Sequence, residues 1–429
     1  MKQQLVRVTR KVLPKGAVKK LENSYRRKRV QLVSARYGNP AKGQNVIAVT
    51  GTNGKTTTLN FVNEILKEAG YRTAMFTTAV IEVAGERRIN DLNATVASTD
   101  RMQRFFRDAK RAKADYTLLE VTSHALDQHK LDGVPIKVAI MTNLTQDHLD
   151  YHLTMDNYAA AKAKMFMNEP EFIVLNRDDE WYDYYDQFPA AAKKITYGKH
   201  DDAEAKIEYT KLYRRGSEAT LVIDHQTKLD LATALPGEFN IYNMVAAASA
   251  AYLLGINVDD IIEGVANLEG VPGRFERVPT GKDFDVFVDY AHTPDALEKF
   301  LEAAKAITKN RVILVFGATG DRDKGKRPIM GEIATRLSDR IILTDEESYS
   351  EDPAAIRQQV MEGIESAGGS GKTTEVEDRH DAIKKALGIA TKGDVVVITG
   401  MGHEKFRIVN GKKLPWNDAD AVREILENS

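Results

Sequence analysis

The sequence contains no cysteine. This absence excludes disulfides, cysteine-based zinc sites, iron–sulfur clusters and thiol nucleophiles, although it leaves the redox compartment open. Any metal ion must therefore be held by oxygen or imidazole ligands. No stretch approaches the ~18 apolar residues that a membrane helix needs, and the amino-terminal region lacks the apolar core of a signal peptide. We therefore expect a cytoplasmic protein.

The sequence has no excess of positive or negative charge. The 61 Lys and Arg residues nearly cancel the 62 Asp and Glu residues, so the chain lacks the basic surplus expected of a nucleic-acid-binding protein. We expect no nucleic-acid partner. The 429 residues exceed the ~100 to 200 residues of a typical domain, which predicts two or three domains.

Short apolar strand-like runs alternate with helix-like segments through most of the chain. Clear pairs are 45–51 with 55–70, 137–143 with 155–166, and 311–320 with 327–338. This alternation favours an α/β fold with parallel sheets covered by helices on both faces.

One domain boundary is expected near residues 268–278, where Gly and Pro interrupt a helical region before a new strand pattern begins. The resulting division is a basic amino-terminal arm over 1–44, a central domain over 45–271 and a carboxyl-terminal domain over 272–429. The arm carries thirteen Lys or Arg residues and a single acid, Glu22. Two interpretations stay open: a solvated helix packed on the body, or a surface for a phosphate-bearing partner or an anionic membrane.

Residues 51–56 read G-T-N-G-K-T, a shortened phosphate-binding loop in which Val49 stands where the usual form has its first glycine. The loop follows a β-branched run and precedes an amphipathic helix over 57–68. Backbone NH groups and the helix amino terminus can cradle phosphate, Lys55 adds positive charge, and Thr56 can offer its hydroxyl to magnesium. This context predicts an ATP triphosphate site rather than a chance match.

Candidate metal ligands follow the next two predicted strands. Glu120 ends the strand-like segment 115–121, at the edge where open parallel sheets bind ligands. The segment 142–152 then contains Asp147, His148, Asp150 and His152, and the following helix offers Lys162. A histidine-rich turn can be purely structural, but its place beside the phosphate loop favours one shared metal pocket.

Ten motifs occur in an order typical of one family. They are TGTNGKTTT, LEVTSHALDQHKLDGV, TNLTQDHLDYH, YAAAKAKMF, LPGEFNIYN, GRFERV, VDYAHTPDAL, FGATGDRDKGKRPIMGEIA, SEDP and GMGHE. From about Ser34 to the carboxyl end, the sequence resembles the Mur ligases, most closely the tripeptide synthetases that add the third residue of the peptidoglycan peptide.

The resemblance implies a central P-loop-type ATPase domain with a mostly parallel sheet, followed by a Rossmann-like α/β domain. It also implies a reaction in peptidoglycan precursor synthesis. Such ligases transfer the γ-phosphate of ATP to a peptide carboxylate, and an amino acid's amine then attacks the acyl phosphate to give an amide, ADP and phosphate. Because negative charge gathers in one place, two magnesium ions and fixed cations are expected. The expected partners are small-molecule muropeptide and amino-acid substrates, and a monomer is expected.

Residue roles follow by similarity. Thr56 and Glu120 would hold one magnesium ion and His148 the other, beside Lys162 as a carbamylated lysine; an unmodified structural Lys162 is the alternative. The implied ATP contacts are Gly51, Thr52, Asn53, Gly54, Lys55, Thr56, Thr57, Asn240, Asn243, Arg274 and Asp289. The implied catalytic positions are Lys55, Lys162, Arg274 and His292. Asn240 and Asn243 would lie on the adenine side, and closure near Gly273 would bring Arg274 and Asp289 over phosphate and ribose.

The sequence departs from the family in three places. First, tripeptide synthetases have an amino-terminal domain that holds the uridine nucleotide, and only the basic arm stands in its place. The arm could bind the substrate's phosphates, the acceptor could lack UDP, or a partner could supply the function.

Second, the D-N-P-R pocket of diaminopimelate-adding members is replaced by Glu346, Glu347, Ser348 and Tyr349. The arginine that would clamp a distal carboxylate is absent, so two acids favour a cationic amino acid such as lysine or ornithine. Surface acids without a ligand are the alternative. Glu404 is retained as a group that could take an amine, whereas the family's lysine in GKGHE has become methionine.

Third, the family's T-T-P dipeptide-binding stretch appears as T-V-A from Thr95, whereas Ser123 and His124 persist. The leading hypothesis is an ATP-dependent amide ligase that extends a muramyl-dipeptide-type acceptor. The enzymatic alternative acts on a lipid-linked muropeptide, polyglutamate, folate or cyanophycin-type carboxylate. The non-catalytic alternative is an ATP-binding assembly protein on the same scaffold.

Overall fold

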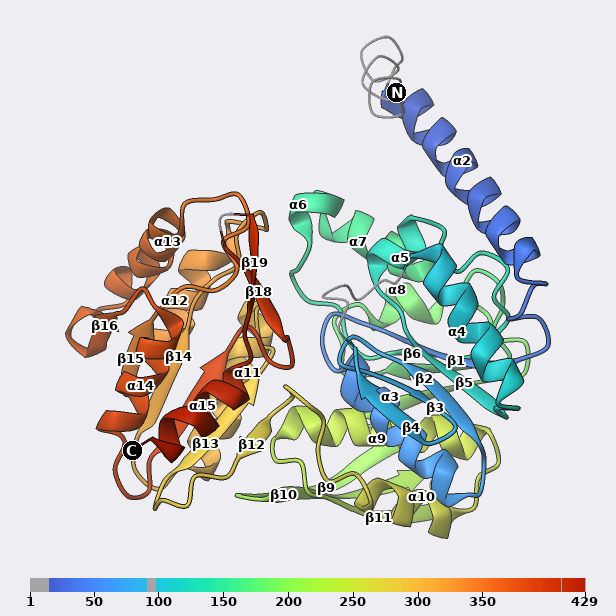
Figure 1. Ribbon diagram of the computed structural model, residues 1–429. Helices are drawn as coiled ribbons and strands as arrows, with labels where there is room; N and C mark the ends of the chain where they lie inside the picture. The colour runs from blue at the N-terminus through green and yellow to red at the C-terminus, as the bar shows by residue number, and fades with distance from the viewer. Residues whose placement is uncertain (1–14, 91–97, 410, 429) are drawn as a thin grey trace.

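The computed structural model describes residues 15–90, 98–409 and 411–428. Two α/β bodies lie side by side, and one helix, α2 (Lys15–Arg36), projects from the first of them (Figure 1). No helix among these residues combines the length and the apolar character needed to span a bilayer.

The larger sheet of the described residues has the strand order β11-β10-β9-β8-β7-β6-β1-β5-β2-β3-β4. Its strands are β1 (Asn45–Thr50), β2 (Thr73–Phe76), β3 (Val80–Val83), β4 (Glu86–Ile89), β5 (Tyr116–Glu120), β6 (Ile136–Met141), β7 (Phe172–Asn176), β8 (Lys193–Gly198), β9 (Ala205–Tyr213), β10 (Gly216–Ile223) and β11 (Thr227–Thr233). The middle of the sheet, from β9 to β2, is parallel, and both margins are antiparallel. The expectation of a mostly parallel sheet is confirmed.

Helices cover both faces of this sheet (Figure 1). They are α3 (Lys55–Glu68), α4 (Thr99–Arg111), α5 (Ser123–Asp127), α6 (Leu149–His152), α7 (Met155–Ala163), α8 (Tyr182–Asp186), α9 (Glu238–Leu253) and α10 (Val258–Ala266). One apolar core joins the sheet to α3, α9 and α10, and a second joins it to α4, α7 and α8. The central strands β1 and β5 are mostly apolar because both faces of the sheet are buried there.

The second sheet has the order β12-β13-β17-β14-β15-β16 among the described residues. Its elements are β12 (Glu276–Val278), β13 (Asp285–Asp289), α11 (Pro294–Ile307), β14 (Val312–Phe316), α12 (Lys326–Leu337), β15 (Arg340–Leu343), α13 (Pro353–Ser366), η1 (Ser370–Lys372), β16 (Thr373–Glu375), α14 (Arg379–Ile389) and β17 (Val395–Thr399). A hairpin and a last helix follow: β18 (Phe406–Val409), β19 (Lys412–Pro415) and α15 (Asp418–Glu427). The strands β13, β17, β14, β15 and β16 are parallel and separate two apolar cores, as expected of a Rossmann-like domain.

The two sheets direct the ends of their parallel strands toward a shared space. Loops after β1, β5 and β6 from the first sheet and after β13, β15 and β17 from the second contribute residues to one cavity. This is the edge at which open α/β sheets bind ligands. The segment between α10 and β12 joins the two bodies. The division at residue 271 remains a prediction.

Candidate active site

The phosphate loop occupies the turn from β1 into α3. Gly51 and Gly54 have φ values of 148° and 86°, which favour glycine. A Cβ atom on Gly51 would lie 1.9 Å from Thr142 Oγ1, and one on Gly54 would lie 2.2 Å from Asn243 Oδ1. Both positions therefore require glycine for space as well as for conformation.

Two lysines meet the carbonyl oxygens of this loop. Lys55 Nζ donates to Thr52 O at 2.7 Å and to Gly51 O at 3.1 Å. Lys162 Nζ, which is buried, donates to Gly51 O at 2.6 Å. Burial lowers the pKa of both amines, and for Lys162 the positive charge of Lys55 lowers it further. The loop therefore contacts two amino groups, and repulsion between them disfavours a positive charge on both at once.

Glu120 lies directly beside the start of α3. Its carboxylate accepts hydrogen bonds from Thr56 Oγ1 at 2.8 Å, from Thr78 N at 2.8 Å and from Thr78 Oγ1 at 2.6 Å. Burial alone would raise the pKa of Glu120, but Lys55 and Arg274 outweigh it and hold the carboxyl in its charged form. The site thus presents a charged carboxylate and a threonine hydroxyl, which are oxygen ligands of the kind that magnesium prefers.

The turn after β6 places His148 near a second carboxylate. His148 adopts a left-handed conformation, with φ 55°, and its Nε2 lies 3.3 Å from Asp147 Oδ2. Burial lowers the pKa of His148 to about 3, so the imidazole is neutral and can offer a lone pair. Burial opposes charge on Asp147, but His148 and the more distant Lys326 and His292 lower the pKa of Asp147 overall.

The second body reaches directly across to the phosphate loop. Arg274 Nη2 donates to Thr56 Oγ1 at 3.3 Å, while its guanidinium lies 4.5 Å from the centre of the Tyr290 ring. His403 Nε2 donates to Thr78 O at 3.0 Å, because that carbonyl can only accept. The two bodies are therefore closed onto each other at this site.

Asp289 and His292 lie at the end of β13, opposite the loop. The carboxylate of Asp289 accepts from the backbone NH groups of Phe275 and Ala291, each at 2.7 Å. His292 Nδ1 donates to Tyr290 O at 2.8 Å, and burial lowers the pKa of His292 to about 4.

One cavity of about 890 Å³ collects most of the residues predicted to form the site. Those that line it are Thr52, Asn53, Gly54, Lys55, Thr56, Thr57, Glu120, His124, His148, Asn243, Arg274, Asp289, His292, Glu347, Tyr349 and Glu404. Those that do not line it are Gly51, Ser123, Lys162, Asn240 and Glu346. Thr95 lies outside the described residues. The structure thus brings segments more than two hundred residues apart in the chain to one enclosed space.

Family comparisons agree with this arrangement. The family model of the Mur ligase middle domain matches residues 49–251, and that of the Mur ligase glutamate ligase domain matches residues 273–402. The chain belongs to the Mur ligase family. It is an ATP-dependent acid–amino-acid ligase, and residues before 49 lie outside both matches.

Individual relatives are similar over nearly the whole chain. A 2,6-diaminopimelate ligase for UDP-N-acetylmuramoyl-L-alanyl-D-glutamate from Clostridium botulinum is 39% identical over 94% of this chain and 82% of its own. Its namesake from Geobacillus kaustophilus is 38% identical over 95% and 84%. A solved diaminopimelate ligase has 34% identity and a TM-score of 0.63, covering 90% of this chain and 79% of its own. Folylpolyglutamate synthase from Mycobacterium tuberculosis with ADP shares the fold alone, at 19% identity and a TM-score of 0.72, covering 87% and 91%.

The far end of the cavity in this Mur ligase carries two carboxylates. Glu347 accepts from Tyr349 Oη at 2.8 Å and from Ile408 N at 3.1 Å. Glu404 accepts from Tyr290 Oη at 3.2 Å. Burial, with the nearby charge of Glu347, raises the pKa of Glu404 to about 9.

Glu346 occupies a different place from its neighbour in the sequence. It accepts from Thr319 Oγ1 at 3.1 Å, and a Cβ atom on Gly400 would lie 1.4 Å from its Oε1. Burial raises the pKa of Glu346 to about 6. Of the two acids that replace the family's pocket motif, the cavity therefore exposes only Glu347.

The remaining predicted positions lie around the edges. Ser123 Oγ and His152 Nε2 are 2.9 Å apart, away from the cavity, whereas the ring of His124 packs 4.7 Å from that of His148. Asn243 Nδ2 donates to Asn240 Oδ1 at 3.2 Å, so Asn240 supports a residue that lines the cavity.

Sequence reasoning missed several residues that shape the site. Thr78 follows β2, and β2 pairs in parallel with β5, which ends at Glu120. Knowledge of the strand order would therefore have predicted that Thr78 lies beside Glu120. His403 and Lys326 lie within motifs of the family, but their partners come from other segments of the chain. His403 Nε2 donates to Thr78 O at 3.0 Å, and Lys326 Nζ donates to His292 O at 2.7 Å. Arg322, which lies over the Tyr349 ring at 5.2 Å, had no signal that separated it from other charged loop residues.

Proposed function

We propose that this Mur ligase extends a muramyl-dipeptide-type acceptor by one amino acid, through an acyl phosphate, in peptidoglycan precursor synthesis. The observation that carries the proposal is the single cavity that joins the phosphate loop and Glu120 to Arg274 and, at its far end, to Glu347 and Glu404. A ligase needs its nucleotide, acid and amine in one enclosed space. The names of the relatives support the acceptor class.

The residues present fit ATP and magnesium. Thr56 and Glu120 would hold one ion, and the neutral imidazole of His148 would contribute to the second. When bound, magnesium supplies positive charge that offsets the phosphates and the developing negative charge. Lys55 and Arg274 add fixed cations on the same side of the cavity. Asn243 would lie on the adenine side, and Asp289 would face the ribose.

The bond changes follow from this arrangement. An oxygen of the acceptor carboxylate forms a bond to the γ-phosphorus of ATP, the bond from that phosphorus to the β–γ bridging oxygen breaks, and ADP leaves. The amine then bonds to the acyl carbon, phosphate leaves, and the amine gives up a proton. Closure of both bodies around the substrates would keep water from competing with the amine.

Lys162 is proposed to act as a carbamate. In that reaction its neutral amine bonds to the carbon of CO₂ and loses a proton, so a buried neutral group becomes an anion. The geometry gives a reason for the change: Lys162 Nζ lies in a buried site beside Lys55, with the carbonyl of Gly51 at 2.6 Å. An anion there would remove the repulsion between the two amines and attract metal ions.

The amino acid is proposed to be cationic, such as lysine or ornithine. Glu347 and Glu404 both line the cavity, and burial together with the charge of Glu347 raises the pKa of Glu404. A side-chain ammonium group placed between them would stabilise both carboxylates in charged form. Tyr349 and Tyr290 hold the two carboxylates through hydrogen bonds.

The test is ADP release by purified protein with ATP and magnesium. We expect release to require both a muramyl dipeptide nucleotide and an amino acid, with lysine or ornithine preferred to diaminopimelate. Acceptors with and without uridine diphosphate should be compared. Activity only on acceptors without it would favour a lipid-linked or polymeric carboxylate. If ADP release depends on no such pair, the proposed substrates, a muramyl-dipeptide-type acceptor and an amino acid, are wrong.

A further inference from the structure

The basic arm carries an exposed apolar stripe along α2. Leu21, Tyr25 and Leu32 are 57%, 56% and 72% exposed. At about 100° of rotation per residue, these three side chains fall within about 40° of one another. They therefore form one line along the helix, called here the α2 stripe.

The stripe faces away from the body. Val30 is 3% exposed, and it lies roughly 160° around the helix from Leu32 at about 100° per residue. Arg27, on the side toward the body, lies with its Nε 3.3 Å from His129 Nδ1 and 3.4 Å from Asp132 Oδ2. Figure 1 shows α2 extending beyond the sheet and its covering helices.

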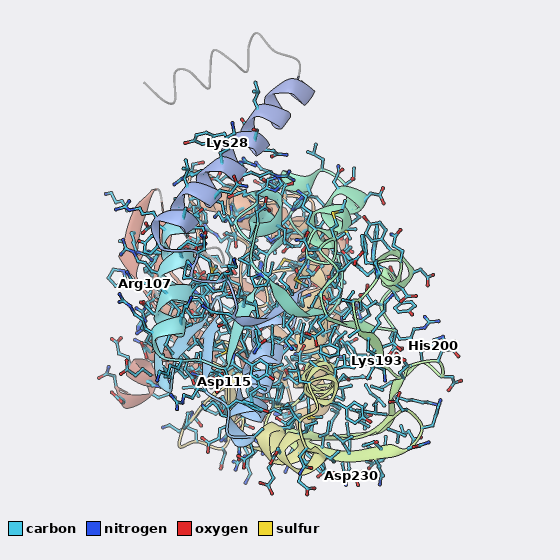
Figure 2. All side chains as sticks on the ribbon, turned by 90° about the vertical axis from the view of Figure 1, so that its right-hand side faces the viewer. Lys28, Arg107, Asp115, Lys193, His200 and Asp230 are labelled. Carbon is cyan, nitrogen blue, oxygen red and sulfur yellow. The ribbon has the colours of Figure 1, made fainter. Side chains whose placement is uncertain are left out.

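Basic side chains border the stripe. Lys28, Arg29 and Arg36 are exposed, and none forms an ion pair with another residue whose side chain the structure describes. Figure 2 shows Lys28 on α2, above Arg107 of α4. The outer surface of the arm thus combines apolar and cationic groups.

The base of the arm is fixed to the central domain. Tyr37 Oη donates to Asp100 Oδ1 at 3.0 Å, and Gln44 Nε2 donates to Phe106 O at 2.8 Å. Gln44 immediately precedes β1, which leads into the phosphate loop. A partner that binds the α2 stripe would therefore also hold the central domain close to that partner.

We propose that the outer face of α2 docks on an anionic lipid bilayer. An interfacial helix needs an apolar face to enter the headgroup region and basic residues for the lipid charge, and neither alone gives stable attachment. The α2 stripe and its border supply both. A second copy of the chain fits less well, because Lys28, Arg29 and Arg36 of two copies would repel. The proposal does not depend on the ligase's substrates.

The experiment is co-sedimentation of the full chain with vesicles of phosphatidylglycerol and phosphatidylcholine, compared with phosphatidylcholine alone. We expect binding to the anionic vesicles only, and weaker binding at high salt. Replacing Lys28, Arg29 and Arg36 with Gln should weaken it roughly a hundredfold, since each basic residue near such a surface contributes about fivefold.

A second variant tests the apolar component. Leu21, Tyr25 and Leu32 are replaced with Ser, which should reduce vesicle binding at least about tenfold. The matched control replaces Ile389, Tyr209 and Leu414, which are exposed elsewhere, with Ser and should bind as the parent does. Thermal unfolding of each variant shows whether it is folded.

Several outcomes would overturn the proposal. These are absence of binding by the parent, equal binding to neutral vesicles, and equal loss in the control variant. Equally tight binding to duplex DNA at the same salt would assign the arm to phosphate in general. The parent could also sediment as a dimer and bind no lipid. If the variant at Leu21, Tyr25 and Leu32 is then a monomer, the α2 stripe binds a second copy of the chain instead.

Discussion

The two ends of the cavity are built in different ways. At the ATP end, one contiguous segment of the chain supplies the two glycines of the turn and Lys55, and its backbone NH groups at Thr52 and Asn53 donate to Asn143. At the amino-acid end, Tyr290, Glu347 and Glu404 come from three separate loops, after β13, β15 and β17. The first end combines one tightly packed loop with side chains such as Glu120 and Arg274, whereas the second is made by side chains from separate loops.

This difference explains why a departure from the family's motif is expected at the amino-acid end rather than at the ATP end. A phosphate loop depends on close packing of its backbone, so a Cβ atom at Gly51 or Gly54 would collide with a neighbour. Such a loop tolerates little change. A pocket made of side chains can change its ligand by one or two substitutions that leave the backbone in place. The replacement of D-N-P-R by residues that include Glu347 is a change of this second kind.

The largest effect is expected from Lys162→Ala at the ATP end. Removing the group proposed to carry a carbamate should reduce ADP release roughly 10³-fold or more for every amino acid, since it removes charge stabilisation of the reaction. A short-chain carboxylic acid should restore part of the rate by supplying an anion. The measurement is ADP release with and without that acid.

Lys164→Ala is the matched control for this test. Lys164 lies two residues further on, and its Nζ binds Asp127 Oδ1 at 2.8 Å outside the cavity. Its replacement should leave the rate within roughly threefold of the parent, because the pair lies outside the cavity. Rescue of the Lys162 variant by a neutral amide as well as by the acid would remove the case for an anion.

The second effect is expected from Arg274→Ala, which removes one of the contacts between the two bodies. Arg274 reaches Thr56 at 3.3 Å, so its loss should lower kcat/KM roughly a hundredfold through lost stabilisation of phosphate charge. Arg277→Ala is the control, because Arg277 binds Asp285 at 2.9 Å outside the cavity. Equal loss in both variants would indicate a general effect on folding.

The same contrast limits what the sequence could predict. The α/β class and the parallel sheets followed from local patterns, because buried parallel strands are apolar on both faces and their helices are amphipathic. The phosphate loop was recognisable because its chemistry lies within six adjacent residues. Glu120 could be placed because a parallel sheet puts the ends of its strands at one edge.

Positions set by distant contacts could not be read in this way. Glu346 and Glu347 look equivalent in the sequence, yet one contacts Thr319 and the other lines the cavity. His403 contacts Thr78, from the other body, and no local pattern predicts a contact between residues so far apart.

A third, smaller effect should separate the two adjacent acids. Glu347→Gln should lower kcat/KM for a cationic amino acid by roughly 10 to 100-fold, since a hydrogen bond to a charged group contributes about 1.5 to 3 kcal/mol. A neutral amino acid should be affected much less. Glu346→Gln is the matched control, because it makes the same chemical change next to the cavity wall. Equal effects of the two variants on lysine and on a neutral amino acid would remove the pocket proposal.

The smallest effect concerns stability and comes from Glu404. Its pKa in the folded protein is raised from 4.5 to about 9, first by burial and then by Glu347. The folded state therefore holds this proton more tightly than the unfolded state does. The stabilising contribution of the protonated form is complete below the unfolded value, and it is lost as pH rises toward the folded value.

Glu404→Gln should remove this loss, because the amide cannot ionise. At about pH 8.5 the variant should be more stable than the parent, whereas near pH 4 the two should differ little. Thermal unfolding at several pH values measures both curves. Lysine should stabilise the parent more at the higher pH, where its ammonium group can pair with the charged carboxylate. Parallel curves for the parent and the variant would show that Glu404 ionises in the cavity without cost, and the need for a cation beside it would disappear.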